Sequence, residues 1–169
     1  MTCHINYFAF GSNLNHFRLH QRIGDFEILG IACLTQHQLV FHKQGADQSG
    51  KCTVVPHFSH DVWGVIYEIN NQQKQKLDFF EGIGHGYSAV YYDLEYRGDT
   101  INALLYQAQL DAMDDGLLPF DWYKAYVLSG AKNHQLPDAH IKHIELTPCI
   151  IDPDQQRSAK NSKIRNGVY

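Results

Sequence analysis

The segment Tyr7-Phe8-Ala9-Phe10-Gly11-Ser12-Asn13-Leu14 passes from an apolar, aromatic run through a glycine to small polar residues. This order predicts a strand that leads through a tight turn into the start of a helix. Gly11 can adopt backbone angles that other residues avoid, and Ser12 or Asn13 can cap the segment that follows. N–H groups left free at such a turn can bind a carboxylate or a developing oxyanion. The same pattern also fits an ordinary strand–turn–helix junction.

Strand patterns dominate the rest of the chain. β-Branched and aromatic residues, partly alternating with polar ones and bounded by glycine or polar clusters, predict strands at residues 4–10, 27–34, 37–43, 52–57, 62–69, 88–97 and 100–108. Helical patterns are fewer and lie near residues 14–22, 71–81, 120–133 and 138–146. Consecutive strands without intervening helices argue against a doubly wound parallel sheet. They predict an α+β protein in which a curled, mixed or largely antiparallel sheet is flanked by α-helices.

Length and composition limit the class of protein. A chain of 169 residues can bury one core but is too short for two ordinary domains, so we expect a single domain over residues 1–169. The formal net charge of −4 gives no electrostatic footprint for nucleic acid. The first residues lack the basic and apolar regions of a signal peptide, and no apolar run is long enough to span a bilayer. We therefore expect a cytoplasmic protein that binds neither nucleic acid nor a membrane.

Metal binding and nucleophilic catalysis receive little support from the sequence. His16 and His20 have the i, i+4 spacing of metal ligands on a helix, but no glutamate follows His16 and no third ligand is evident. Ser12 lacks the G-x-S-x-G elbow of a serine hydrolase, since Phe10 stands two residues before it. The scattered cysteines form no C-x-x-C pair and are expected to be reduced and mostly buried; they are Cys3, Cys33, Cys52 and Cys149.

The chain is polar and basic from about residue 152 onward. After Asp154 no acidic residue balances its four cations, which are Arg157, Lys160, Lys163 and Arg165. A basic arm for an acidic partner is one interpretation. The one we favour is a solvated or frayed tail that packs loosely on the domain.

The predicted helix over residues 71–81 places a carboxylate at its end. It begins at a polar cluster and stops at Gly82, so that Glu81 is its last residue. Three features favour the neutral acid there, as a general base near neutral pH requires. These are the negative end of the helix dipole, the like charge of Asp78, and the apolar neighbours Phe79, Phe80 and Ile83. A surface glutamate at a helix end is the alternative.

Four segments, in this order, resemble the γ-glutamyl cyclotransferase family. The first is the segment quoted above, which is similar to the family's Y-x-x-Y-G-S-N-L signature. The others are Asp61-Val62-Trp63-Gly64-Val65-Ile66-Tyr67, then Leu77-Asp78-Phe79-Phe80-Glu81-Gly82, then Tyr123-Lys124 followed by Ser129-Gly130-Ala131-Lys132-Asn133. The resemblance covers about residues 5–145. It implies a small β-barrel with helices packed around it.

The resemblance also implies a reaction. A γ-glutamyl amino acid, or a related γ-glutamyl amide, would be converted to 5-oxoproline and a free amine when its own α-amine attacks the γ-glutamyl carbonyl. Such a reaction needs a base, an acid and donors for the tetrahedral oxyanion. The family's D-x-x-E-G pattern carries the catalytic glutamate, and Glu81 occupies that position here. Asp78 is the competing carboxylate, expected to cap or pair structurally. No metal or organic cofactor is implied.

Substrate-binding residues follow from the same resemblance. They are Tyr7, Phe8, Ala9, Phe10, Gly11, Ser12 and Asn13 of the turn, with Tyr123. Tyr87 follows the glycine-rich segment Gly84-His85-Gly86 and is predicted from that position to line the same pocket. Packing on the barrel is the alternative role for Tyr123, and Phe10 replaces a family tyrosine and lacks its hydroxyl. Two other functions stay open: a cyclotransferase for a different γ-glutamylamine or metabolite, and a non-catalytic small-molecule binding module. The choice between a monomer and a homodimer also stays open.

Overall fold

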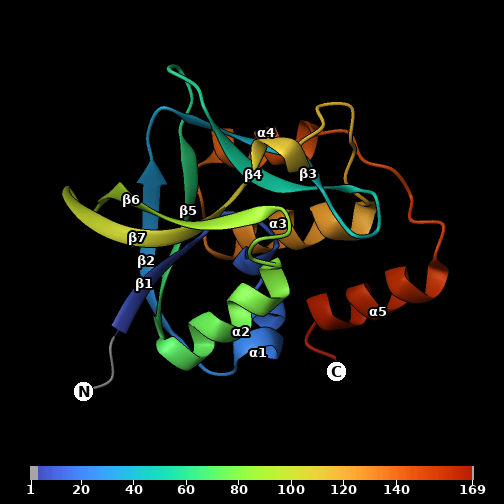
Figure 1. The fold of residues 1–169 in the computed structure, drawn as a ribbon, viewed down its shortest axis with the longest axis horizontal. Coiled ribbons are helices and arrows are strands. Elements are labelled where there is room, and N and C mark those ends of the chain that lie inside the picture. Colours follow the sequence, from blue (N-terminus) through green and yellow to red (C-terminus); the bar gives the residue numbers. More distant parts are fainter. Residues whose placement is uncertain (1–3, 169) are drawn as a thin grey trace.

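The computed structural model describes residues 4–168, and a closed five-stranded barrel forms its centre (Figure 1). Around the barrel the strands follow in the order β1 (His4–Ala9), β5 (Val62–Asn70), β2 (Glu27–Leu34), β6 (Tyr87–Tyr96) and β7 (Asp99–Ala108). Neighbouring strands are antiparallel, except that β1 and β7, which close the barrel, run parallel to each other. The predicted α+β class with a small mixed barrel is confirmed.

Helices and a separate ribbon surround this barrel. The helices are α1 (His16–Ile23), α2 (Asn71–Glu81), α3 (Asp121–Asn133), α4 (Asp138–Leu146) and α5 (Gln155–Arg165), with short 3₁₀ turns η1 (Ser12–Leu14) and η2 (Leu110–Ala112). Strands β3 (His37–Gln44) and β4 (Gly50–Pro56) pair with each other as a two-stranded ribbon, and Lys43 of β3 also forms an isolated antiparallel bridge with Met113. Every strand and helix expected from the sequence is present, with its ends within two residues of the expected ones.

Two glycines allow the close packing that shapes the molecule near the first strand. A Cβ at Gly64 of β5 would lie 2.4 Å from the carbonyl oxygen of Ala9 and 2.6 Å from the ring of Phe8. A Cβ at Gly130 of α3 would lie 2.4 Å from the carbonyl carbon of Leu14. Because both side chains are absent, β1 packs tightly on β5 and α3 packs directly on the turn that follows β1.

The C-terminal segment is a helix and not the loose tail expected from its composition. Asp154 caps α5 by accepting from the Arg157 N–H, and Ile164 is buried. The buried carboxylate of Asp152 accepts from the Trp122 indole at 2.7 Å and from the Arg157 guanidinium at 2.6 Å. Packing of α5 against α1 and α3 supplies the stabilisation that its polar sequence does not indicate.

The cysteines agree with the expectation of reduced thiols where the structure describes them. Cys33 and Cys52 are buried, Cys149 is exposed, and none of the three forms a disulfide. Cys3 lies outside the described residues. Between residues 4 and 168, no helix combines the length and the apolar character needed to cross a membrane.

Candidate active site

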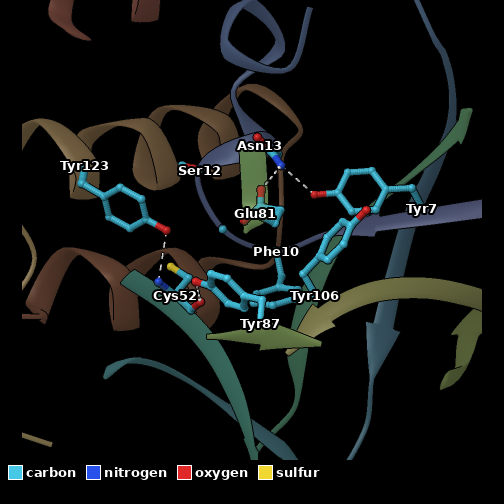
Figure 2. A pocket seen from close by; sticks show the side chains of 10 residues that line it. Tyr7, Phe10, Ser12, Asn13, Cys52, Glu81, Tyr87, Tyr106 and Tyr123 are labelled. Atoms are coloured by element: carbon cyan, nitrogen blue, oxygen red, sulfur yellow. Dashed lines mark hydrogen bonds between the residues drawn. The ribbon is translucent and has the colours of Figure 1, made fainter. Parts of the chain in front are cut away.

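A pocket of about 320 Å³ lies where the turn after β1 meets α2, α3 and the strand ends (Figure 2). Seven elements or their flanking turns contribute to it, although they are far apart in the sequence. Its lining residues are Tyr7, Phe10, Gly11, Ser12, Asn13, Cys52, Glu81, Tyr87, Tyr106 and Tyr123. The structure therefore brings together most of the site residues predicted from the sequence.

Glu81 enters this pocket from the last position of α2. The helix begins with a capping box between Asn70 and Gln73 and ends at Gly82, which adopts the left-handed conformation at φ 63° and ψ 52°. The Glu81 side chain is 16% exposed. Its Oε1 accepts from Asn13 Nδ2 at 3.1 Å and from Arg22 Nη1 at 2.9 Å. No donor within residues 4–168 bonds to Oε2, so this oxygen is left for a ligand.

The surroundings of Glu81 differ from those expected. Phe79 is 82% exposed, and Phe80 and Ile83 are also exposed, so these side chains do not enclose the carboxylate. Asp78 is engaged elsewhere, at 2.7 Å from both Lys74 Nζ and the Tyr106 hydroxyl, which confirms its structural pairing. The neighbour that the sequence did not reveal is the Arg22 guanidinium.

Asn13 connects the groups that hold Glu81. Its amide is buried, and Nδ2 donates to the Tyr7 hydroxyl at 2.7 Å as well as to Glu81. Its Oδ1 accepts from Arg22 Nη1 at 2.9 Å. Arg22 and Asn13 together fix the orientation of the carboxylate. Because the Tyr7 oxygen is an acceptor in this network, its own proton is available to the pocket.

Two further tyrosines face the pocket from opposite sides of Cys52. The Tyr123 hydroxyl accepts from the Cys52 N–H at 3.0 Å, whereas the Tyr87 hydroxyl donates to the Cys52 carbonyl at 2.6 Å. Burial raises the pKa of Tyr7, Tyr87 and Tyr123 above the ordinary tyrosine value, so all three stay protonated near neutral pH. Tyr123 both packs in the core and presents an O–H donor to the pocket.

The turn at Gly11 forms for reasons other than those expected. Gly11 has φ −110°, and its small size is required because a Cβ would lie 3.0 Å from the Cβ of Cys52. The cap of α1 is Asn15, whose side chain accepts from the Arg18 N–H at 3.0 Å, and neither Ser12 nor Asn13 serves as that cap. Ser12 Oγ instead accepts from Arg18 Nε at 3.0 Å.

Two predicted binding residues do not reach the site. Phe8 and Ala9 are buried against β5 and do not line the pocket, so the structure does not bring them together with Glu81. Sequence reasoning missed Arg22, Cys52 and Tyr106. The sequence does predict that Tyr106 and Cys52 lie on strands. Tyr106 reaches Glu81 because β7 pairs with β1, and Cys52 reaches it because of the position of the β3–β4 ribbon. Neither of these long-range contacts can be recognised from a local sequence pattern.

The pocket opens into a larger outer cavity of about 980 Å³, which we call the vestibule. Ser12, Glu81, Tyr87 and Tyr123 line both cavities. The vestibule adds the cationic side chains Arg18, Arg22, Lys43 and Lys51, together with His85, Phe80, Gly82 and the segment Gln44–Ala46. A ligand that fills the inner pocket can therefore extend past Glu81 into a positively charged space.

The remaining candidates for metal binding lie outside this site. The His16 and His20 rings stack at 6.3 Å on the surface of α1, and His20 Nε2 lies 3.1 Å from Asp25. Within the described part of the chain, no cluster of three or more histidine, cysteine, aspartate or glutamate side chains is arranged to hold a metal ion.

The chain is similar in sequence and in fold to known proteins. The family model "Gamma-glutamyl cyclotransferase, AIG2-like" matches residues 7–125. The gamma-glutamylcyclotransferase of Bos taurus is 27% identical over 170 residues, which cover 95% of this chain and 85% of the relative. That of Homo sapiens is 29% identical over 138 residues, covering 78% and 72%. A solved structure named gamma-glutamyl cyclotransferase superposes with a TM-score of 0.84 at 23% identity, covering 95% of this chain and 99% of the other, and so shares the fold.

Proposed function

This chain belongs to the gamma-glutamyl cyclotransferase, AIG2-like family and is an enzyme of that type, and we propose that it uses Glu81 to convert a γ-glutamyl amino acid, or a related γ-glutamyl amide, into 5-oxoproline and a free amine. One observation carries the proposal. Glu81 Oε1 is held by Arg22 and Asn13, whereas Oε2 is open to the pocket. A carboxylate fixed through one oxygen can exchange protons through the other.

The proposed reaction begins with removal of a proton from the substrate's α-ammonium group by Glu81 Oε2. The freed amine attacks the γ-carbonyl carbon, a carbon–nitrogen bond closes the five-membered ring, and the carbonyl electrons move to the oxygen. Glu81 then gives its proton to the leaving nitrogen, the original amide bond breaks, and the carbonyl is restored. The ring nitrogen still carries two protons, and it loses one to the regenerated carboxylate, which passes it to the released amine so that the amine departs as an ammonium ion. One carboxylate thus serves first as base and then as acid.

Donors for the oxyanion and for the substrate carboxylate are available around Glu81. The Tyr123 O–H is free to donate because its oxygen already accepts from the Cys52 N–H. The Tyr7 O–H is in the same situation through Asn13. The N–H groups at the start of η1 have no partner within that turn and line the pocket at Gly11–Asn13. Fixed donors of this kind stabilise developing negative charge without reorganisation.

The lining of the pocket supports cyclisation as the outcome. Buried tyrosines, among them Tyr7, Tyr87 and Tyr123, line the inner pocket around Glu81, an arrangement that favours a folded glutamyl group. Holding the α-amine beside the γ-carbonyl gives it a high effective molarity, so that it competes with water. Ser12 is a poor alternative nucleophile, since the partner of its Oγ is the Arg18 guanidinium and not a base.

The alternatives left open by the sequence are less well supported. A binding module has no need for a carboxylate that is fixed through one oxygen and presents the other, Oε2 of Glu81, without a partner among residues 4–168. We also propose a cytoplasmic location, which the unpaired thiols of Cys33, Cys52 and Cys149 support. Homodimer formation stays a prediction.

The test is a panel of γ-glutamyl compounds assayed for release of 5-oxoproline, with wild type and Glu81→Gln. We expect Glu81→Gln to lower kcat by about 10²–10⁴-fold, because it loses the proton acceptor. Its side-chain oxygen can still accept from Arg22 and Asn13, so the fold should be retained. Asp78→Asn is the matched control, and its loss of rate should be much smaller because its partners are Lys74 and Tyr106.

A second measurement separates cyclisation from hydrolysis. In isotope-labelled water the released 5-oxoproline should contain no solvent oxygen, and a substrate with an acetylated α-amine should be inert. Ser12→Ala should retain activity above that of Glu81→Gln. Release of free glutamate carrying solvent oxygen, together with an inactive Ser12→Ala enzyme, would identify a serine hydrolase and overturn the proposal.

A further inference from the structure

Lys43 is exceptional among the cations of the vestibule. Arg22 is paired with Glu81, Lys51 with Asp47 at 2.8 Å, and Arg18 is bonded to Ser12 and Asn161 and lies 4.4 Å from the centre of the Tyr126 ring. The Lys43 side chain has no ion pair and no hydrogen bond to any residue between 4 and 168. Its ammonium group therefore has free capacity to bind an anion.

The position of Lys43 is defined by its neighbours. Its Nζ lies 4.8 Å from the centre of the Tyr87 ring, and Tyr87 lines both the inner pocket and the vestibule. Gly86 has φ +126°, and a Cβ there would lie 2.8 Å from Lys43 Cε and 3.2 Å from Nζ. The absence of a side chain at Gly86 thus lets the lysine lie against the backbone at the junction of the two cavities.

The environment of Lys43 favours a negatively charged partner. Burial lowers the pKa of Lys43, and the carboxylates of Glu81 and Asp47 oppose that effect from a distance. A partly desolvated ammonium without a paired charge is unfavourable, and an anion bound beside it removes that cost. Arg18 adds to the attraction, because its bonded partners in the structure, Ser12 and Asn161, are uncharged.

From this arrangement we infer that Lys43 is a specificity-determining residue that binds an anionic group, such as a carboxylate, on the leaving amine of the substrate. The inference rests on the proposed function, in which Glu81 serves both the α-amine and the leaving nitrogen. Since Glu81 lines both cavities, the glutamyl group occupies the inner pocket and the leaving amine extends past Tyr87 toward Lys43. The chemical class selected is a γ-glutamyl conjugate with negative charge close to its scissile amide.

A matched pair of substrates tests the inference. γ-Glutamyl-alanine and γ-glutamyl-alaninamide have nearly the same shape, but only the first has a carboxylate on the leaving amine. We expect wild type to favour γ-glutamyl-alanine in kcat/KM by on the order of tenfold, the lower end of the range for a charge-assisted hydrogen bond. Lys43→Gln should bring this ratio close to one. Lys160→Gln, which removes a charge from the exposed face of α5, should keep the wild-type ratio.

A charge reversal provides the second test. Lys43→Glu should reverse the preference, so that the γ-glutamyl conjugate of a diamine, with its free ammonium group, becomes a better substrate than γ-glutamyl-alanine. A wild-type ratio near one, or a ratio that Lys43→Gln and Lys43→Glu leave as in wild type, would overturn the inference. Failure of the proposed function is distinguishable, because neither alanine compound would then yield 5-oxoproline with any variant.

Discussion

Replacement of Arg22 by methionine should loosen the orientation in which the site holds the Glu81 carboxylate. The Arg22–Glu81 pair is 2.9 Å long, and the two side chains are only 13% and 16% exposed. Arg22→Met leaves the carboxylate without its cation, removes the donor to Asn13 Oδ1, and loses the contact of the guanidinium with the Phe80 ring at 5.2 Å.

The cost of Arg22→Met can be worked from these contacts. Removing one partner of a buried pair costs about 3–5 kcal/mol, and the residual exposure and the retained Asn13 bond place this case near the lower end, at about 3 kcal/mol. For a chain of this size that corresponds to a fall in Tm of roughly 6–12 °C. With the carboxylate less firmly oriented, kcat should fall by about tenfold or more.

The decisive measurement is kcat at a temperature well below Tm, because a purely structural role would not change it there. In Arg22→Met the Oε1 atom of Glu81 keeps only its bond from Asn13, so the carboxylate is less firmly oriented and kcat should fall. Arg22→Lys, which keeps the charge, should lower kcat less. Lys74→Met is the matched control, since it breaks the Lys74–Asp78 pair one turn earlier on α2 and should leave kcat close to that of wild type.

The reasoning is refuted if Arg22→Met has the wild-type kcat while its Tm falls as expected. Arg22 would then stabilise the fold without acting through Glu81. If Lys74→Met lowered kcat as far as Arg22→Met does, the effect would belong to the overall charge of α2 and not to the Arg22 contact.

Two further outcomes follow from buried hydrogen bonds. Tyr123→Phe should lower kcat/KM by about ten- to a hundredfold, because it removes a donor from the pocket. It should also lower the unfolding free energy by about 1–3 kcal/mol, because the Cys52 N–H loses its acceptor. Wild-type activity would exclude Tyr123 from the reaction. Asp152→Asn should destabilise the protein by about 2 kcal/mol at pH 7. Hydrogen bonds from Arg157 lower the pKa of Asp152 from 3.8 to about 2, so its stabilising effect is present above pH 3.8 and is lost as pH falls through about 2. The difference in Tm between wild type and Asp152→Asn, measured by thermal melts, should therefore narrow over that interval, and a constant difference would contradict this account.

Local patterns determined the elements of this protein. Alternation of apolar residues, the polar start at residues 70–73 and the glycine at 82 were sufficient to predict the strands and to put Glu81 at a helix end, because strand alternation and helix capping depend on residues only a few positions apart. Helix α5 is the exception. Its residues lack an apolar stripe, and it forms because Asp152, Asn161 and Ile164 contact α1 and α3.

Local sequence was sufficient to predict the strands, helices α1 to α4 and the tight turn at Gly11, and its resemblance to a family identified the carboxylate of Glu81. The groups that surround this carboxylate follow from the packing of the fold. Arg22 reaches it from α1, Tyr106 from β7 and Cys52 from a ribbon outside the barrel, over separations of 25 to 59 residues. The order of strands around a closed barrel and the packing of helices on it depend on contacts between distant segments. No local pattern records those contacts, and for that reason the exposed Phe79 and the unpaired Lys43 could be recognised only in the fold.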